Sequence, residues 1–187
     1  MAEPGEIRGE RVVLRHMVRA DVDQMATWPL FDDPDLRWAN LELAYPSDRD
    51  SYFERGRSAS SRRRYVILDE ADTIVGTIGL RNLDFETGEG TLGIIIRADA
   101  VGQGYGTDAV RALVRYSFEV LRLRRLLLDV ALSNARARRV YDKLGFVPIG
   151  EHVGPANAAY VDMVLDREAY RRQKAGQAPV RSERTVR

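Results

Sequence analysis

Hydrophobic positions along the chain follow two spacings, one typical of β-strands and the other typical of α-helices. Apolar runs and alternating apolar positions predict strands over residues 11–15, 65–68, 74–80, 90–96, 126–131, 146–152 and 160–166. Apolar residues three and four positions apart predict helices over residues 21–28, 47–60, 104–120 and 134–144, with a terminal helix beginning at residue 167. The interspersed strands and helices indicate a mixed α+β fold.

The pattern also predicts how some of these elements are connected. The strands at 65–68, 74–80 and 90–96 are separated by short turns, which is typical of an antiparallel meander. Residues 126–131 form an apolar run, as expected for a strand that is covered on both faces. Residues 28–45 instead combine aromatic, acidic and proline residues, and we expect an irregular excursion there.

Composition places the chain among single globular domains. It has 187 residues, with 29 Lys and Arg against 28 Asp and Glu, and 44% of its residues are hydrophobic. We therefore expect one domain over residues 1–174 and a disordered tail over residues 175–187. With no cysteine and only 2 histidines, the sequence offers no disulfide, no cysteine nucleophile and no histidine-rich metal cage, so no metal is expected.

Charge and hydropathy narrow the range of partners. A formal net charge of +1 gives no reason to expect nucleic-acid binding. No apolar run approaches the roughly 18 residues of a membrane span, and the N-terminal residues lack the pattern of a signal peptide. We expect a cytoplasmic protein that binds neither nucleic acid nor membrane.

A glycine-rich turn links the strand ending at Ile96 to the next amphipathic helix. Its sequence is Val101-Gly102-Gln103-Gly104-Tyr105-Gly106-Thr107. Alternating glycines let the backbone approach a ligand closely, and the start of a helix presents free N–H groups, so an anionic phosphate is the natural ligand. The same residues would also suit a simple turn that starts a helix.

Two nucleotide-binding templates fit this turn poorly. The P-loop pattern fails because no lysine follows the glycines. The dinucleotide fingerprint nearly fits, and Asp129 lies in the next strand, but the third glycine comes one residue early and the preceding strands form an antiparallel meander. The sequence therefore disfavours a dinucleotide.

A second group of polar residues lies on the helix predicted over residues 134–144. Asn134 and Tyr141 are seven positions apart, so they share a face of this helix and are separated by roughly 10 Å along its axis. Asn134 also suits a helix N-cap, and Tyr141 also suits an amphipathic core position. On their own, these two residues leave both interpretations open.

Together, the glycine turn and the downstream pattern Asn-x6-Tyr-x-Lys-x-Gly-Phe resemble the GNAT superfamily of acyl-CoA-dependent N-acyltransferases. The resemblance covers residues 8–168. Segments 9–15, 92–96 and 141–146 are most similar to the RimJ/RimL-type branch of ribosomal-protein alanine N-acetyltransferases, which also includes polyamine and small-amine acetyltransferases. It implies a twisted, mainly antiparallel sheet of six to seven strands, flanked by helices and splayed between its fourth and fifth strands.

The resemblance implies acetyl-CoA as the cosubstrate. The turn amides would bind its pyrophosphate, the strand ending at Ile96 would pair with its pantetheine arm, and Gly93 would form a bulge that opens this strand edge. Asn134 would hydrogen-bond the pantetheine or the nearby phosphates, and Tyr141 would reach the sulfur. The implied cosubstrate-binding residues are Ile94, Ile95, Ile96, Val101, Gly102, Gln103, Gly104, Tyr105, Gly106, Thr107, Asn134 and Lys143.

This sequence departs from the family at the first position of the turn, where Val101 replaces the Arg or Gln that is often found there. Any positive charge near the phosphates must then come from elsewhere. The candidates on the following helix are Arg136, Arg138, Arg139 and Lys143, which would also suit a solvated helix face.

Direct transfer is the favoured chemistry, because the chain has no cysteine and no serine in a recognisable nucleophile elbow. Backbone amides near Ile94 and Ile95 would stabilise negative charge on the thioester oxygen, and Tyr141 would act as the catalytic residue that protonates the leaving thiolate, given a phenol pKa of about 10. No general base is assigned. The side chains near the expected cleft are Asp84, Glu86, Glu89 and His152, and a water relay could replace any of them.

The expected acceptor is a primary amine, either a small cationic amine or a protein N-terminus. Four carboxylates of the excursion lie among three aromatic residues: Asp32, Asp33, Asp35 and Glu42 beside Trp28, Phe31 and Trp38. Carboxylates near aromatic rings suit a cation, although the same segment would also serve as a cover for the core. A homodimer is compatible with the resemblance. The alternative function is a GNAT-like module that binds acyl-CoA or an amine without turnover.

Overall fold

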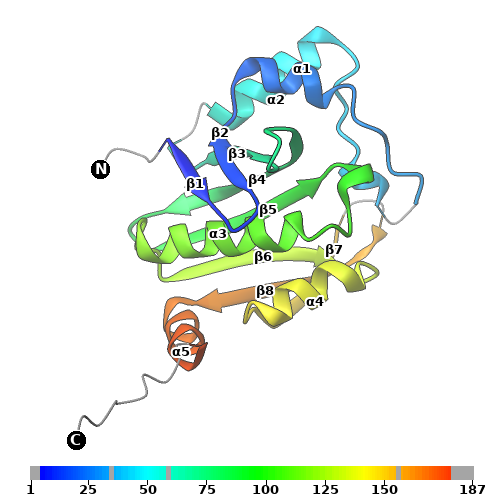
Figure 1. Ribbon diagram of the computed structural model, residues 1–187. Helices are drawn as coiled ribbons and strands as arrows, with labels where there is room; N and C mark the ends of the chain where they lie inside the picture. Colours follow the sequence, from blue (N-terminus) through cyan, green and yellow to red (C-terminus); the bar gives the residue numbers. More distant parts are fainter. Residues whose placement is uncertain (1–4, 34–35, 58–59, 155–156, 178–187) are drawn as a thin grey trace, which may run out of the picture.

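The computed structural model describes residues 5–33, 36–57, 60–154 and 157–177, which form a single sheet flanked by helices (Figure 1). The strands are β1 (Glu6–Arg8), β2 (Val13–His16), β3 (Arg63–Leu68), β4 (Ile74–Asp84), β5 (Glu89–Ile96), β6 (Arg125–Ala131), β7 (Val147–Val153) and β8 (Ala159–Asp166). The α-helices are α1 (Arg19–Met25), α2 (Pro46–Arg57), α3 (Tyr105–Glu119), α4 (Ala135–Lys143) and α5 (Arg167–Gln177). Two short 3-10 helices, η1 (Arg37–Ala39) and η2 (Ala98–Ala100), lie in the connections.

The strand order in the 8-stranded sheet is β1-β2-β3-β4-β5-β6-β8-β7. Neighbouring strands are antiparallel except for β5 and β6, which are parallel. The expected mixed, mainly antiparallel architecture is therefore confirmed, with one strand more than the upper expectation. The additional strand is β1, whose 3 residues pair with β2 at the sheet edge and are too few to give a clear alternation in the sequence.

Two hydrophobic cores lie on the two faces of the sheet, because successive residues of a strand point to opposite faces. On β3, Tyr65 and Ile67 belong to the larger core, which also contains buried residues of α3 and α4. Their neighbours Val66 and Leu68 belong to a smaller core with α1 and α2. Figure 1 shows α1 (blue) and α2 (cyan) together, away from α3 (green) and α4 (yellow).

The parallel strands β5 and β6 pair over only one end of their length. The paired residues are 89–91 of β5 and 125–127 of β6. Beyond Thr91, β5 stays paired with β4 as far as Ile96, but the described part of the chain provides no strand on its other side. The two strands therefore splay apart as the resemblance implied, and the edge of β5 faces an opening.

The expected bulge at Gly93 is wrong. Gly93 pairs in register with Gly79 of β4, and the irregularity in this pair of strands lies between Arg81 and Asp84. A Cβ atom built on Gly93 would have no other atom within 4 Å. Gly93 therefore lies in a regular part of the ladder, beside open space at the splay.

The helices that follow the predicted motifs begin where the sequence indicated. α3 begins directly after Gly104, and α4 begins directly after Asn134. At the other end of the chain, α5 continues to Gln177, so residues 175–177 are helical and do not belong to a disordered tail. The rest of the expected tail, residues 178–187, lies outside the described residues.

Candidate active site

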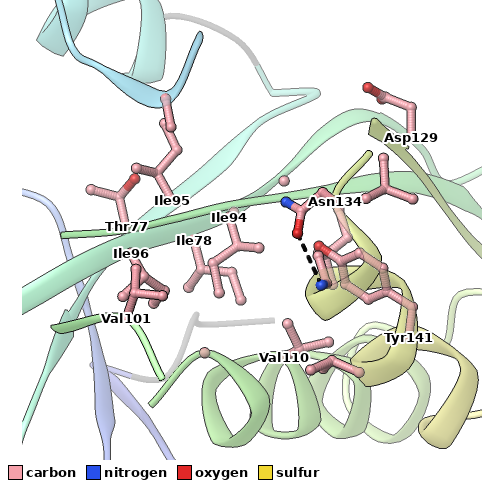
Figure 2. A pocket seen from close by; sticks show the side chains of 18 of the residues that line it. Thr77, Ile78, Ile94, Ile95, Ile96, Val101, Val110, Asp129, Asn134 and Tyr141 are labelled. Carbon is pink, nitrogen blue, oxygen red and sulfur yellow. Dashed lines mark hydrogen bonds between the residues drawn. The ribbon is translucent and has the colours of Figure 1, made fainter. Parts of the chain in front are cut away.

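A cavity of about 920 Å³ lies where β5 and β6 diverge. Its walls come from β3 to β6, the glycine turn before α3, one face of α4 and the excursion before α2, with one residue each from α2 and β8. Figure 2 shows Thr77 and Ile95 on one side of β4 and β5, and Ile78, Ile94 and Ile96 on the side that faces α3. The cavity therefore borders both faces of the sheet.

The glycine turn forms the end of the cavity nearest to Ile96. Gly102 and Gly104 have φ angles of +87° and +90°, which lie in the left-handed region that disfavours a side chain. Gly104 is the N-cap of α3, and the first N–H of the helix to find a helical acceptor is that of Asp108, 3.1 Å from the Gly104 carbonyl. The N–H groups of the first three helical residues are therefore available to a ligand at the positive end of the helix dipole.

Arg11, from the loop between β1 and β2, holds this turn in place. Its Nη1 donates to the carbonyl oxygen of Gln103 at 2.7 Å, and its guanidinium lies over the ring of Tyr105, 4.8 Å from the centroid. The backbone N–H of Arg11 in turn donates to the buried carboxylate of Asp108 at 2.8 Å. A hydrogen bond to Glu70 raises the pKa of Arg11, so the cation is maintained beside the turn. Sequence reasoning did not assign Arg11 to the site, because it lies 92 positions before its partner Gln103.

Asn134 serves as the N-cap of α4. Its Oδ1 accepts a hydrogen bond from the backbone N–H of Ala137 at 3.1 Å, which confirms the capping interpretation. The same side chain lines the cavity, where Figure 2 shows it opposite Ile94. Because capping uses Oδ1, the Nδ2 amide is left as the donor for a ligand.

Tyr141 combines a core ring with a hydroxyl at the cavity. The residue is 7% exposed, and its ring packs edge-on against Phe146 with 5.8 Å between centroids. Figure 2 shows its oxygen directed toward Asn134. Burial, together with the carboxylate of Asp129, raises the pKa of Tyr141 to about 12. The hydroxyl therefore stays protonated at neutral pH and is available as a donor.

Asp129 is the only carboxylate among the described residues that line the cavity. It lies on β6 just beyond the last residues paired with β5 and forms an ion pair with Arg81 of β4. After burial, its charge is the second cause that raises the pKa of both Tyr141 and Tyr160. In the sequence it had entered only as part of the rejected dinucleotide template. The signal that would have found it is a charged residue inside an otherwise apolar strand.

The structure brings most, but not all, of the predicted site residues to the cavity. Those that line it are Ile94, Ile95, Ile96, Val101, Gly102, Gly104, Gly106, Thr107, Asn134 and Tyr141. Gln103 and Tyr105 instead contact Arg11, and Lys143 is exposed at the end of α4, where its carbonyl accepts a hydrogen bond from Gln173 at 3.0 Å. Of the four cations proposed for α4, Arg136 lines the cavity.

The side chains considered as general bases are not among the described residues that line the cavity, although His152 contacts Tyr160, which does line it. Glu89 is ion-paired with Arg125, and Asp84 accepts hydrogen bonds from backbone amides of its own turn, which lower its pKa. His152 on β7 contacts Asp162 at 3.1 Å and stacks on Tyr160. Glu86 is exposed beside the same turn.

The acidic excursion contributes apolar residues to the described cavity wall. Phe31, Leu36 and Ala39 line the cavity, whereas Asp32, Asp33 and Glu42 are exposed and are not among its lining residues. Asp35 lies outside the described residues. The guanidinium-bearing residues of the lining are Arg62, Arg63, Arg64, Arg81 and Arg136.

Neither a metal site nor a membrane span is found among the described residues. They contain no group of three or more His, Cys, Asp or Glu side chains placed to hold a metal ion. None of their helices has both the length and the apolar character needed to cross a bilayer.

Fold and site together define an α+β protein whose mainly antiparallel sheet is splayed beside a glycine turn with available backbone amides. The family model described as "Acetyltransferase (GNAT) domain" matches residues 11–147. The chain therefore belongs to the GNAT acetyltransferase family, as the sequence motifs predicted.

Named relatives show which enzymes the chain resembles. It is 29% identical over 138 residues to spermidine N(1)-acetyltransferase of Vibrio cholerae serotype O1, covering 74% of each chain. It is 38% identical over 93 residues to aminoglycoside N(6')-acetyltransferase type 1 of Klebsiella pneumoniae, covering 48% of this chain and 46% of that one. The dodecameric structure of spermidine N-acetyltransferase from Vibrio cholerae has the same fold, with a TM-score of 0.70 at 21% identity, covering 86% of this chain and 96% of that one.

Proposed function

We propose that the protein is an acetyl-CoA-dependent N-acetyltransferase that moves an acetyl group directly to a primary amine. The observation that carries this proposal is the junction between two ligand-binding features. The unpaired edge of β5 runs to Ile96, and the glycine turn with its available amides follows directly. Membership of an acetyltransferase family and the amine-acetylating names of the relatives support the same reaction.

The cosubstrate fits these residues in an extended arrangement. Its phosphates would accept hydrogen bonds from the amides between Gly102 and Thr107, with the Arg11 cation beside the turn. Its pantetheine arm would pair with β5 in the manner of an added strand. The Nδ2 amide of Asn134 would donate to the same arm from the opposite wall.

The strand backbone would also stabilise the reacting carbonyl. Neighbouring residues of a strand direct their N–H groups to opposite sides, so only one of Ile94 and Ile95 presents its amide to the splay. That amide would donate to the thioester oxygen as negative charge develops there, when the amine nitrogen bonds to carbon and the carbon–sulfur bond breaks. Gly93 leaves the space that this approach requires.

Tyr141 would donate a hydrogen bond to the departing sulfur. With a pKa of about 12, its complete deprotonation by a thiolate of ordinary pKa, about 8.5, would be uphill by about 5 kcal/mol. Stabilisation of the thiolate through the hydroxyl proton is therefore favoured over full proton transfer. This corrects the sequence-based expectation of a phenol with a pKa of about 10.

Asp129 would face the acceptor amine. One of its oxygens is engaged by Arg81, and a carboxylate has a second oxygen with free lone pairs. That oxygen would bind the ammonium group and accept the proton that it must lose before the neutral amine can attack. The second proton, which the nitrogen loses after the carbon–nitrogen bond has formed, would pass to the departing thiolate.

The test is the release of thiol from acetyl-CoA across a panel of primary amines, together with acetyl-CoA binding by calorimetry. An acetyltransferase binds acetyl-CoA and releases thiol only when a suitable amine is added. Tight binding with no amine-dependent release would instead establish a non-catalytic acyl-CoA-binding module. Failure to bind acetyl-CoA would overturn both assignments.

A further inference from the structure

The cavity has an arginine-rich wall on the face of the sheet that packs against α2. Alternation along β3 places Arg64 on the same face as Val66, which belongs to the core with α1 and α2. Arg62 directly precedes β3, and its Nη1 donates to the carbonyl oxygen of Arg55 on α2 at 3.3 Å. Both arginines line the cavity. They lie on the opposite face of the sheet from α3 and the glycine turn. The turn would therefore contact the cosubstrate, and the arginines would contact the acceptor.

The strand register places Arg64 in the same cross-strand row as Gly93, where β5 has separated from β6. Arg64 pairs with Gly79, and Gly79 pairs with Gly93. Two strand spacings separate Arg64 from Gly93, a distance of roughly 10 Å between Cα atoms. Arg64 and Gly93 line the same cavity, so a ligand that extends from the splay along this face of the sheet can reach the arginine.

The guanidinium of Arg64 is held in a fixed orientation. Its Nη1 donates to the carbonyl oxygen of Tyr52 at 2.9 Å, and its plane lies over the Tyr52 ring, 4.3 Å from the centroid. These contacts occupy one N–H group and one face, so the remaining N–H groups keep the planar fork that suits a carboxylate or phosphate.

No carboxylate of the described residues forms an ion pair with Arg62 or Arg64. Burial lowers the pKa of Arg64, and the nearby Arg62 and Arg55 lower it further, although a contribution from Tyr52 opposes them. The guanidinium is partly withdrawn from water and lies near other positive charges. A bound anion would offset both the lost hydration and the repulsion between the cations.

The charge balance of the whole cavity lining also favours a bound anion. Its described residues include five arginines and one carboxylate, and that carboxylate, Asp129, is already paired with Arg81. A polycation such as spermidine would meet an excess of positive charge here. An amine that carries its own anionic group would be complementary, with the ammonium at Asp129 and the anion at Arg64.

We infer that the acceptor is a small zwitterionic amine, whose carboxylate or phosphate group is bound by Arg64 and Arg62 while its amino group is acetylated. This inference rests on the proposed function and deepens it by naming the substrate class. The determinant of acceptor specificity is then the arginine-rich wall, and not the carboxylates of residues 28–45 as the sequence had indicated.

The test uses pairs of acceptors that differ only in the anionic group: ω-amino acids against alkylamines of equal length, and aminoalkyl phosphates against the corresponding amino alcohols, with spermidine as the polycation. We expect the anionic member to have at least a roughly tenfold higher kcat/KM, because charge-assisted hydrogen bonds to arginine are worth about 1.5–3 kcal/mol. The carboxylate and phosphate series show which anion fits better. Equal or better use of the neutral members or of spermidine would overturn the inference.

Substitutions show which residues cause the preference for anionic acceptors. Arg64→Gln and Arg62→Gln are expected to reduce the preference for the anionic member, whereas Arg64→Lys keeps the charge and retains part of it. Arg171→Gln, an exposed change on α5, is the matched control and leaves the preference unchanged. If Arg64→Gln does not fold, as judged by its melting temperature, Arg62→Gln and Arg64→Lys still decide the outcome. If the preference for anionic acceptors is unchanged in every folded Arg62 and Arg64 variant, these arginines do not bind the anionic group.

A binding measurement separates this inference from the proposed function. Calorimetric titration of the CoA-loaded protein with each acceptor pair reports the anion preference without any turnover. A protein that releases thiol with amines but shows no anion preference refutes the substrate class alone. A protein that binds the anionic members through Arg64 but never releases thiol refutes the transferase function and retains the anion site.

Discussion

Arg81 of β4 and Asp129 of β6 form an ion pair that spans the intervening strand β5, beside the level at which β5 and β6 separate. The Asp129 side chain is 32% exposed and that of Arg81 is 48% exposed, so the pair is accessible from the cavity and is screened by solvent. Such a pair contributes little to stability by itself. Its position gives Asp129 a fixed orientation at the point where the acceptor amine would enter.

Asp129→Asn is expected to lower kcat/KM for the amine by roughly 100-fold, because the amide cannot take up a proton from the attacking nitrogen. Acetyl-CoA affinity should be unchanged, since the cosubstrate is proposed to bind along β5 and the glycine turn. Steady-state kinetics with calorimetric binding of acetyl-CoA measures both. The matched variant is Arg81→Gln, which removes the partner but keeps the carboxylate. Equal losses of kcat/KM in the two variants would show that Asp129 acts only through its ion pair with Arg81, which supports the structure where β5 and β6 separate.

Tyr141→Phe removes one hydroxyl and leaves the ring that packs on Phe146. Loss of a hydrogen bond to a developing thiolate, about 1.5–3 kcal/mol, should lower kcat by roughly 10- to 100-fold with little change in acetyl-CoA affinity. Tyr170→Phe provides the control, because the pKa of Tyr170 is also raised to about 12 but its hydroxyl donates to Glu119 at 2.8 Å, on α3. Undiminished kcat in Tyr141→Phe at saturating substrates would leave Tyr141 a core residue only.

The raised pKa of Tyr141 makes a prediction for alkaline pH. The native state holds the phenol proton up to a pKa of about 12, whereas an unfolded tyrosine releases it near 10. Between these values the native state binds more protons than the unfolded state, so the stability that this difference provides is complete below pH 10 and is lost as the pH rises towards 12. The difference between the ultraviolet titrations of the wild type and Tyr141→Phe should show a tyrosine that ionises near pH 12. A difference transition near pH 10 would show that Tyr141 is not shielded from water in solution.

Local patterns were sufficient to predict the parts of the fold that are encoded by contiguous residues. The glycines before α3, the apolar stripe of α3 and the capping position of Asn134 all lie within short segments, and each is found where expected. The short edge strand β1 and the regular pairing of Gly93 were not predicted. Both depend on a partner strand, and sequence spacing alone does not specify a strand's register.

The chemistry of the site was predicted only where the motif is local. Tyr141 and Asn134 share one helix, whereas Arg11, Arg64 and Asp129 reach the site from three different strands or loops through tertiary contacts. The three consecutive arginines at residues 62–64, at the start of β3, suit a solvated strand end equally well, so their place in the cavity lining had no signature in the sequence. The carboxylates of the excursion formed the more visible cluster, but those that the structure describes are exposed.

Asn134 allows the ligand contact to be separated from the helix cap, because the two use different atoms. Asn134→Ser keeps an oxygen for the N–H of Ala137, now 3.1 Å from Oδ1, but removes the Nδ2 donor. We expect Asn134→Ser to retain nearly the wild-type free energy of unfolding and to weaken acetyl-CoA binding by roughly tenfold, the value of one hydrogen bond. Asn134→Ala loses both groups and should cost about 1 kcal/mol of stability as well. Urea unfolding and calorimetric titration of the two variants measure the two effects separately. Full acetyl-CoA affinity in a folded Asn134→Ser protein would restrict Asn134 to capping α4.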